Sequence, residues 1–131
     1  MTRLDHIGIA VARIEDALPL WRDLLGLRLV AIEEVPGEQV RVAVLDAGGT
    51  RIELLEPTDP ESPIARHLLK RGPGIHHLAL STADLATTMN VLRDGGAPPM
   101  DEVPRAGAQG CKVTFVHPRH TGGVLLELSQ P

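Results

Sequence analysis

The chain has 131 residues, 43% of them apolar, and a net charge of −4. That length suits one compact domain and is too short for two independent ones. Basic residues are scattered and aromatic residues make up only 2%, which argues against a duplex-binding surface and a base-stacking platform. The single cysteine allows no intrachain disulfide, and no apolar run is long enough to cross a bilayer. We therefore expect a cytoplasmic protein with neither nucleic acid nor membrane as a partner.

The first half of the chain predicts a strand, a helix and three more strands. Residues 4–11 alternate between a face of small residues that begins with His6 and an apolar face, which is the period of a strand. Apolar residues at helical spacing over 14–25 predict a helix that ends at Gly26. Pro19 is expected either to kink this helix or to displace its start. Turn-forming pairs separate further strands expected at 28–35, 39–45 and 50–55.

The second half repeats this order after a connector at residues 58–73 that holds a short helix. We interpret residues 1–57 and 74–131 as two halves of a single domain, residues 1–131. The expected fold class is α+β, with tandem βαβββ modules forming one curved mixed sheet around a cleft. After an irregular or edge segment rich in proline the sheet ends with two strands, so the elements of the second half are expected at 75–81 (strand), 85–93 (helix), 112–116 and 124–128 (strands).

Each half carries one histidine in its first strand and one glutamate in its last strand. His6 precedes Glu53 by 47 positions, and His77 precedes Glu127 by 50. Each glutamate lies between apolar neighbours, although strand alternation leaves open that it faces water, and a lone histidine in a strand is more often structural. The repetition favours a shared metal site in the cleft. Two imidazoles and two carboxylates suit a divalent ion of Co, Ni, Mn, Fe or Zn.

Other residues are candidates for binding a small anionic substrate. Arg105 lies in a glycine-containing loop that is either a surface turn or a lid, and Lys112 is a candidate partner for a phosphate or carboxylate. His117 precedes the last strand, where it either lines the cleft or forms a turn. Gln39 is a further candidate for substrate binding. No glycine run follows a strand and opens a helix, which excludes a dinucleotide-binding or P-loop motif.

Several segments resemble the methylmalonyl-CoA epimerases, a family of the vicinal oxygen chelate superfamily. The resemblance implies the tandem βαβββ fold, usually as a homodimer, an acyl-CoA substrate, and His6, Glu53, His77 and Glu127 as metal ligands. The segments that carry it run nearly end to end: Asp5-His6-Ile7-Gly8-Ile9-Ala10-Val11, Ile52-Glu53-Leu54-Leu55-Glu56-Pro57, Ser62-Pro63-Ile64-Ala65, Gly74-Ile75-His76-His77-Leu78-Ala79, Pro104-Arg105-Ala106-Gly107, Phe115-Val116-His117-Pro118 and Gly123-Val124-Leu125-Leu126-Glu127-Leu128.

The reaction implied is the interconversion of (R)- and (S)-methylmalonyl-CoA by removal of the proton α to the thioester, through a metal-stabilised enolate. Glu127 is the expected catalytic base, although a tightly bound metal ligand makes a poor base. Some relatives have a second glutamate in the third strand, whereas this chain has Val42 or Ala43 there, depending on where the gap is placed. The role of the second base then has to fall to Glu127 alone, to a water molecule or to another residue such as Glu38.

Two rival functions share the same scaffold. A lactoylglutathione lyase of the glyoxalase I type also needs a metal and a carboxylate base. A metal-free small-molecule-binding member of the superfamily uses the cleft without chemistry. The segment from Pro104 to Leu128 favours the epimerase.

Overall fold

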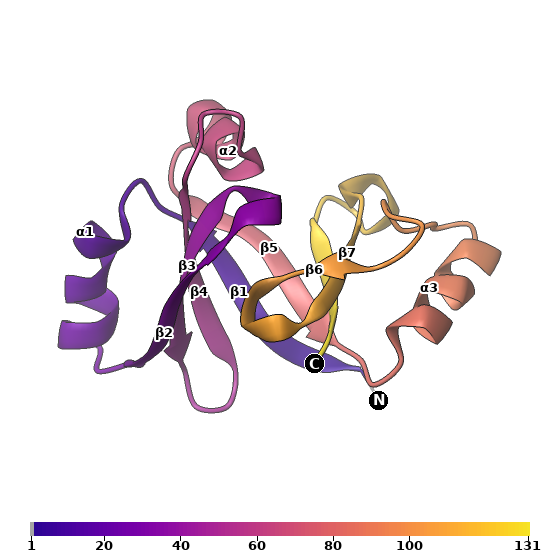
Figure 1. Cartoon of the computed structure of the whole chain (residues 1–131), viewed down its shortest axis with the longest axis horizontal. Helices are drawn as coiled ribbons and strands as arrows, with labels where there is room; N and C mark the ends of the chain where they lie inside the picture. Colours follow the sequence, from indigo (N-terminus) through magenta and orange to yellow (C-terminus); the bar gives the residue numbers. More distant parts are fainter. Residues whose placement is uncertain (1) are drawn as a thin grey trace. The chain divides into compact units, whose positions relative to one another are not determined.

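The computed structural model describes residues 2–131 (Figure 1). The order strand, helix, three strands occurs twice, as predicted, and α2 lies between the two copies. No helix within residues 2–131 is both long and apolar enough to cross a membrane. The elements are β1 (Arg3–Ala10), α1 (Ile14–Leu18), η1 (Pro19–Leu24), β2 (Arg28–Val35), η2 (Pro36–Glu38), β3 (Val40–Asp46), β4 (Arg51–Pro57), α2 (Pro63–Arg71), β5 (Gly74–Ser81), α3 (Leu85–Asp94), β6 (Arg105–Ala106), η3 (Ala108–Gly110), β7 (Lys112–Val116), η4 (Pro118–His120) and β8 (Leu126–Gln130).

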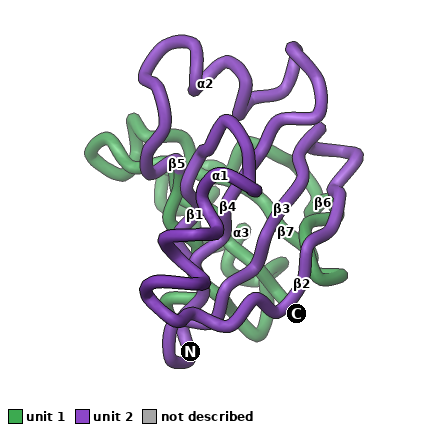
Figure 2. The backbone as a smooth tube through the Cα atoms, turned by 90° about the vertical axis from the view of Figure 1, so that its left-hand side faces the viewer, with its two compact units in different colours: residues 1–5, 77–131 green, residues 6–76 purple. Residues whose placement is uncertain are grey.

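The strands form a mixed sheet in the order β2-β3-β4-β1-β5-β8-β7-β6. The chain divides into two compact units, and the division cuts through β1 and β5, so that each unit holds part of both strands (Figure 2). We call residues 6–76 the N-unit, and residues 77–131 with the N-terminal residues up to Asp5 the C-unit. The tandem βαβββ arrangement of one mixed sheet expected from the sequence is confirmed.

In the N-unit, one face of the strands packs on the first helix. β4 pairs in parallel with β1 and antiparallel with β3, which pairs antiparallel with β2. The kink expected at Pro19 is a change of helix type: α1 continues as the π-helical η1, whose wider turn is closed by a 2.9 Å hydrogen bond from Leu25 N to Leu20 O. The buried core of this face consists of Ile14, Leu18, Ala43, Leu45 and Leu54.

The C-unit is built in the same way around α3. β8 pairs in parallel with β5 and antiparallel with β7, and the short β6 adds to the far side of β7. β8 begins and ends two residues later than predicted, because Val124 belongs to a turn in which its N–H donates to Thr121 Oγ1 at 3.0 Å. The helix side of this unit is filled by Leu85, Met89, Val116 and Leu128.

Candidate metal centre and active site

The N-unit brings His6 and Glu53 together on the face turned away from α1. β1 and β4 run parallel, and their register pairs Glu53 with Gly8, two residues after His6. Gly8 has no side chain, and His6 Nδ1 lies 3.4 Å from Glu53 Oε2. Both residues are buried, at 4% and 5% exposed.

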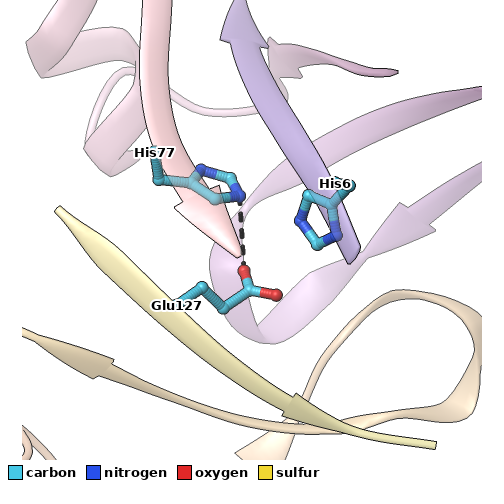
Figure 3. Close-up of side chains that lie close together, drawn as sticks. All are labelled: His6, His77 and Glu127. Atoms are coloured by element: carbon cyan, nitrogen blue, oxygen red, sulfur yellow. Dashed lines mark ion pairs between the residues drawn. The ribbon is translucent and has the colours of Figure 1, made fainter. Parts of the chain in front are cut away.

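The C-unit repeats this geometry with His77 and Glu127 (Figure 3). The parallel pairing of β5 with β8 places Glu127 opposite Ala79, again two residues after the histidine and again a small residue. His77 Nε2 lies 3.4 Å from Glu127 Oε1, and the two residues are 6% and 7% exposed. The duplication seen in the sequence is therefore a duplication of strand register, which the residue spacing alone did not establish.

Burial decides one question that strand alternation had left open. Neither Glu53 nor Glu127 faces water, so each carboxylate needs a partner to offset the cost of its desolvation. The two His–Glu separations of 3.4 Å exceed the usual hydrogen-bond range, which suits donor atoms that share a cation. A donor set of imidazole nitrogens and carboxylate oxygens fits a first-row divalent metal.

Arg105 and His77 both contact the ring of Phe115. The ring of Phe115 makes an edge contact with the ring of His77, with centroids 6.0 Å apart. The guanidinium carbon of Arg105 lies 5.3 Å from the centroid of the same Phe115 ring. The Nε of Arg105 lies 3.3 Å from Asp101 Oδ2, which also accepts a 3.0 Å hydrogen bond from the buried hydroxyl of Thr114.

Asp101, Thr114 and Phe115 were not predicted from the sequence as site residues. Spacing gave one weak signal, an aspartate four residues before an arginine, but nothing in the sequence shows that Thr114 anchors that aspartate. The loop that carries Arg105 also packs directly on β7: a Cβ added at Gly107 would lie 2.7 Å from a methyl carbon of Val113. Arg105 is therefore held in place from two sides.

The other candidate substrate-binding residues are more dispersed. Lys112 is exposed on β7, opposite Gln130 of β8. His117 is exposed and begins η4, where its Nδ1 accepts a 3.0 Å hydrogen bond from Arg119 N, so it forms the turn that the sequence had left as one alternative. Gln39 is half-buried in the N-unit and adopts a left-handed conformation with φ of 53°, which delays the start of β3 to Val40.

The register also separates Val42 from Ala43, the two residues that the sequence left as counterparts of the second glutamate in some relatives. Val44 lies opposite Glu53, and Val42 lies opposite Leu55, so Val42 shares the face of Glu53. Ala43 points the other way, into the core with Ile14. Of these two residues, the buried Val42 is therefore the one on the face that holds Glu53.

A family model described as Glyoxalase/Bleomycin resistance protein/Dioxygenase superfamily matches residues 5–115. The chain belongs to this superfamily, and its fold is the vicinal oxygen chelate fold that the sequence predicted.

Similar proteins define the family within it. The chain is 43% identical to the uncharacterized protein YqjC of Bacillus subtilis (100% of this chain, 94% of the relative). It is 37% identical to the ethylmalonyl-CoA/methylmalonyl-CoA epimerase of Cereibacter sphaeroides (98% and 97%). The Mycobacterium tuberculosis methylmalonyl-CoA epimerase superposes with a TM-score of 0.94 at 40% identity (98% and 87%). A Streptomyces coelicolor methylmalonyl-CoA epimerase variant in complex with 2-nitronate-propionyl-CoA gives 0.93 at 35% (99% and 97%). The chain belongs to the methylmalonyl-CoA epimerase family.

Proposed function

We propose that this protein is a metal-dependent epimerase that interconverts (R)- and (S)-methylmalonyl-CoA. The observation that carries the proposal is the repeated His–Glu pair, buried in both units with the same strand register. Family membership supplies the substrate class, because epimerases of this name are similar to the chain along almost its whole length. Neither rival function has a comparable observation in its favour.

The proposed ligands of the metal are His6, Glu53, His77 and Glu127. His6, His77 and Glu127 are also the described residues that make up a candidate metal-binding group, and Figure 3 draws their side chains together. A divalent ion held there supplies a Lewis acid that stabilises the negative charge of the enolate. The proposal requires the two His–Glu pairs to act together, one from each unit.

Glu127 is proposed to move the proton. A carboxylate has two oxygens, so one can remain directed at the ion while the other accepts the α-proton of the substrate. The buried position of Glu127 keeps bulk water away from the reacting carbon. Removal of the proton by Glu127 gives a planar carbon, and the return of a proton to its opposite face inverts the stereocentre.

The anionic parts of the acyl-CoA are proposed to bind Arg105 and Lys112, with Gln39 and His117 as further substrate contacts. Arg105 is the best supported of these, because its guanidinium pairs with Asp101 and lies against the ring of Phe115, which also contacts the ring of His77. A planar guanidinium binds carboxylate and phosphate oxygens in pairs. A methyl and an ethyl substituent differ by one methylene, so discrimination between them is expected to stay within about 1–3 kcal/mol.

An exchange assay in deuterated water tests this function. Purified protein with added divalent ion should replace the α-proton of (S)-methylmalonyl-CoA with deuterium and generate the (R) isomer, followed by NMR and by chiral analysis. Methylglyoxal with glutathione is the matched rival substrate. No exchange with any of the five candidate ions, or turnover of the hemithioacetal instead, would reject the epimerase.

We also propose that the enzyme works in the cytoplasm as a homodimer, as the resemblance to the family implies. Analytical ultracentrifugation should then give twice the 14.1 kDa mass of the chain. A monomer at micromolar concentration would refute the dimer and leave the proposed chemistry unchanged.

A further inference from the structure

The C-unit carries a positive charge on the same face of its sheet as its His–Glu pair. Strand register establishes this, because Phe115 of β7 is the direct cross-strand partner of Glu127, and Arg105 of β6 is the partner of Val113. Directly paired residues point to the same side of a sheet, and so do residues two apart on one strand. The side chains of Glu127, Phe115, Val113 and Arg105 therefore share one face.

The packing of α3 on the opposite face agrees with this assignment. Leu128 belongs to the same buried cluster as Leu85 of α3. Its cross-strand partner is Thr114, which is fully buried. Leu128 follows Glu127 directly along β8, so Glu127 and the exposed Arg105 lie on the face that is turned away from α3.

The guanidinium of Arg105 lies over the side chain that is next to Glu127. Its carbon is 5.3 Å from the centroid of the Phe115 ring, and the same ring contacts the imidazole of His77 with centroids 6.0 Å apart. That imidazole lies 3.4 Å from Glu127 Oε1 (Figure 3). A single aromatic ring therefore separates the positive charge of Arg105 from the pair formed by His77 and Glu127.

Asp101 orients this guanidinium through its Nε edge. Asp101 Oδ2 lies 3.3 Å from Arg105 Nε, and the same oxygen accepts a 3.0 Å hydrogen bond from the hydroxyl of Thr114. Most donors of a guanidinium belong to its two terminal nitrogens, and the side chain of Arg105 is 43% exposed. Arg105 can therefore bind a second carboxylate while Asp101 holds its orientation.

The chemistry of the substrate shows which of its anionic groups lies closest to Glu127. The free carboxylate of methylmalonyl-CoA is bonded to the α-carbon, whereas the phosphates lie at the far end of the long pantetheine arm. An α-carbon that meets Glu127 brings its own carboxylate with it, next to the cation beyond Phe115. Lys112 lies two residues before the buried Thr114, on the opposite face, and so does not compete for this carboxylate.

We propose that Arg105 binds the free carboxylate of the acyl group and makes the protein specific for thioesters that carry a carboxylate on the α-carbon. The inference rests on the proposed function and names the part of the substrate that Arg105 recognises. Asp101 and Phe115 position the guanidinium, which donates parallel hydrogen bonds to the two carboxylate oxygens. A simple acyl-CoA has a hydrogen atom in place of the carboxylate and leaves these donors without a ligand partner.

Calorimetric titration of the full chain with racemic methylmalonyl-CoA and with propionyl-CoA tests this role, because the two ligands differ only in the carboxylate. Arg105→Met keeps an unbranched side chain and removes its donors. The variant should bind methylmalonyl-CoA about tenfold more weakly than wild type and propionyl-CoA less than about twofold more weakly. Arg105→Lys keeps the charge without the planar fork and should recover part of the loss.

Arg3→Met is the matched control, because it removes an exposed arginine of the same unit and should bind both ligands as wild type does. Equal weakening of both ligands by Arg105→Met would show that Arg105 binds the phosphates, and unchanged binding of both would show that it binds neither anion. Either result would overturn the assignment. Absence of α-proton exchange in the wild-type protein would instead reject the proposed function, whereas the selective loss of methylmalonyl-CoA binding reports on Arg105 alone.

Discussion

At the scale of single residues, burial of two carboxylates distinguishes this site from a surface feature. Glu53 lies between Ile52 and Leu54, and Glu127 lies between Leu126 and Leu128. This pattern suits a glutamate facing water as well as one facing a metal. Both glutamates were found from the sequence, but only the strand register shows how each meets its histidine. Each glutamate is paired across the strands with a small residue, and the histidine lies two residues before that small residue. Local sequence does not encode that pairing.

Replacement of His77 by alanine should remove metal binding and turnover together. The change deletes one nitrogen donor and removes the imidazole that lies 3.4 Å from Glu127 Oε1. We expect a loss of at least about 100-fold in both metal affinity and rate, because even residues that only support a metal ligand are worth about 10–100-fold. Elemental analysis and the exchange assay measure the two quantities. His120→Ala, on the surface turn η4, is the control, and an active metal-free His77→Ala protein would disprove the ligand assignment.

Asp101 is predicted to act through Arg105. Asp101→Asn keeps an acceptor for Thr114 but removes the charge that faces the guanidinium. Because the pair is partly exposed and worth at most about 1 kcal/mol, KM for the acyl-CoA should rise by up to about fivefold while kcat stays the same. Steady-state kinetics separate the two, with Glu102→Gln as the neighbouring control. A fall in kcat at constant KM would show that Arg105 does not bind the ground-state substrate.

At the scale of elements, each unit ties the start of its helix to the strand that carries its glutamate. Glu56 Oε1 accepts a 2.7 Å hydrogen bond from Ile14 N, and Gln130 Oε1 accepts a 2.8 Å hydrogen bond from Leu85 N. Each acceptor lies three residues after the proposed metal ligand of the same strand. The repeat therefore includes the hydrogen bond that links helix to strand in each unit. The sequence does not predict this bond, because Glu56 and Gln130 look like ordinary polar residues at the end of a strand.

Loss of this link is predicted to destabilise the fold. Glu56→Ala leaves the first N–H of α1 without its acceptor and should lower the free energy of unfolding by about 0.5–2 kcal/mol, the usual cost of losing a helix cap. Glu56→Gln retains an oxygen acceptor and should lose less. Urea unfolding measures the difference, and Glu61→Ala on the exposed connector should stay within about 0.5 kcal/mol of wild type. Equal stability of Glu56→Ala and wild type would show that the bond contributes nothing.

The contact between α2 and β5 predicts a pH dependence of stability. The rings of His67 and His76 meet edge to face, with centroids 5.0 Å apart, and the pKa of His76 is lowered from 6.5 to about 4 by burial first and by the charge of His67 second. In the unfolded chain His76 binds a proton below about pH 6.5, whereas in the folded protein it binds one only below about pH 4. The free energy of unfolding therefore falls as the pH is lowered through this window.

The His76→Asn variant isolates this contribution. Allowing for partial solvent screening, the wild type should lose about 1–3 kcal/mol more unfolding free energy between pH 7 and pH 4.5 than the variant does. Urea unfolding at the two pH values gives the comparison, with His120→Asn as a control that keeps the wild-type dependence. The same slope in wild type and His76→Asn would refute the lowered pKa.

At the scale of the whole molecule, the sequence predicted the repeated order of elements and most strand limits to within two residues. It succeeded because alternation, helical spacing and the turn-forming pairs are local properties. It failed where the outcome depends on pairing between strands. The bulge between Leu29 and Ala31 in β2, and the position of Val42 rather than Ala43 on the face of Glu53, are both consequences of register.

Titration of the metal-free protein with a single divalent ion tests the central claim most directly. The α-proton exchange of methylmalonyl-CoA is followed as ion is added. If four side chains bind one ion, the rate of α-proton exchange should rise from background and reach its plateau at one ion per chain. Full α-proton exchange in the metal-free protein would contradict the proposed metal dependence. Binding of one ion per chain without any α-proton exchange would contradict it as well.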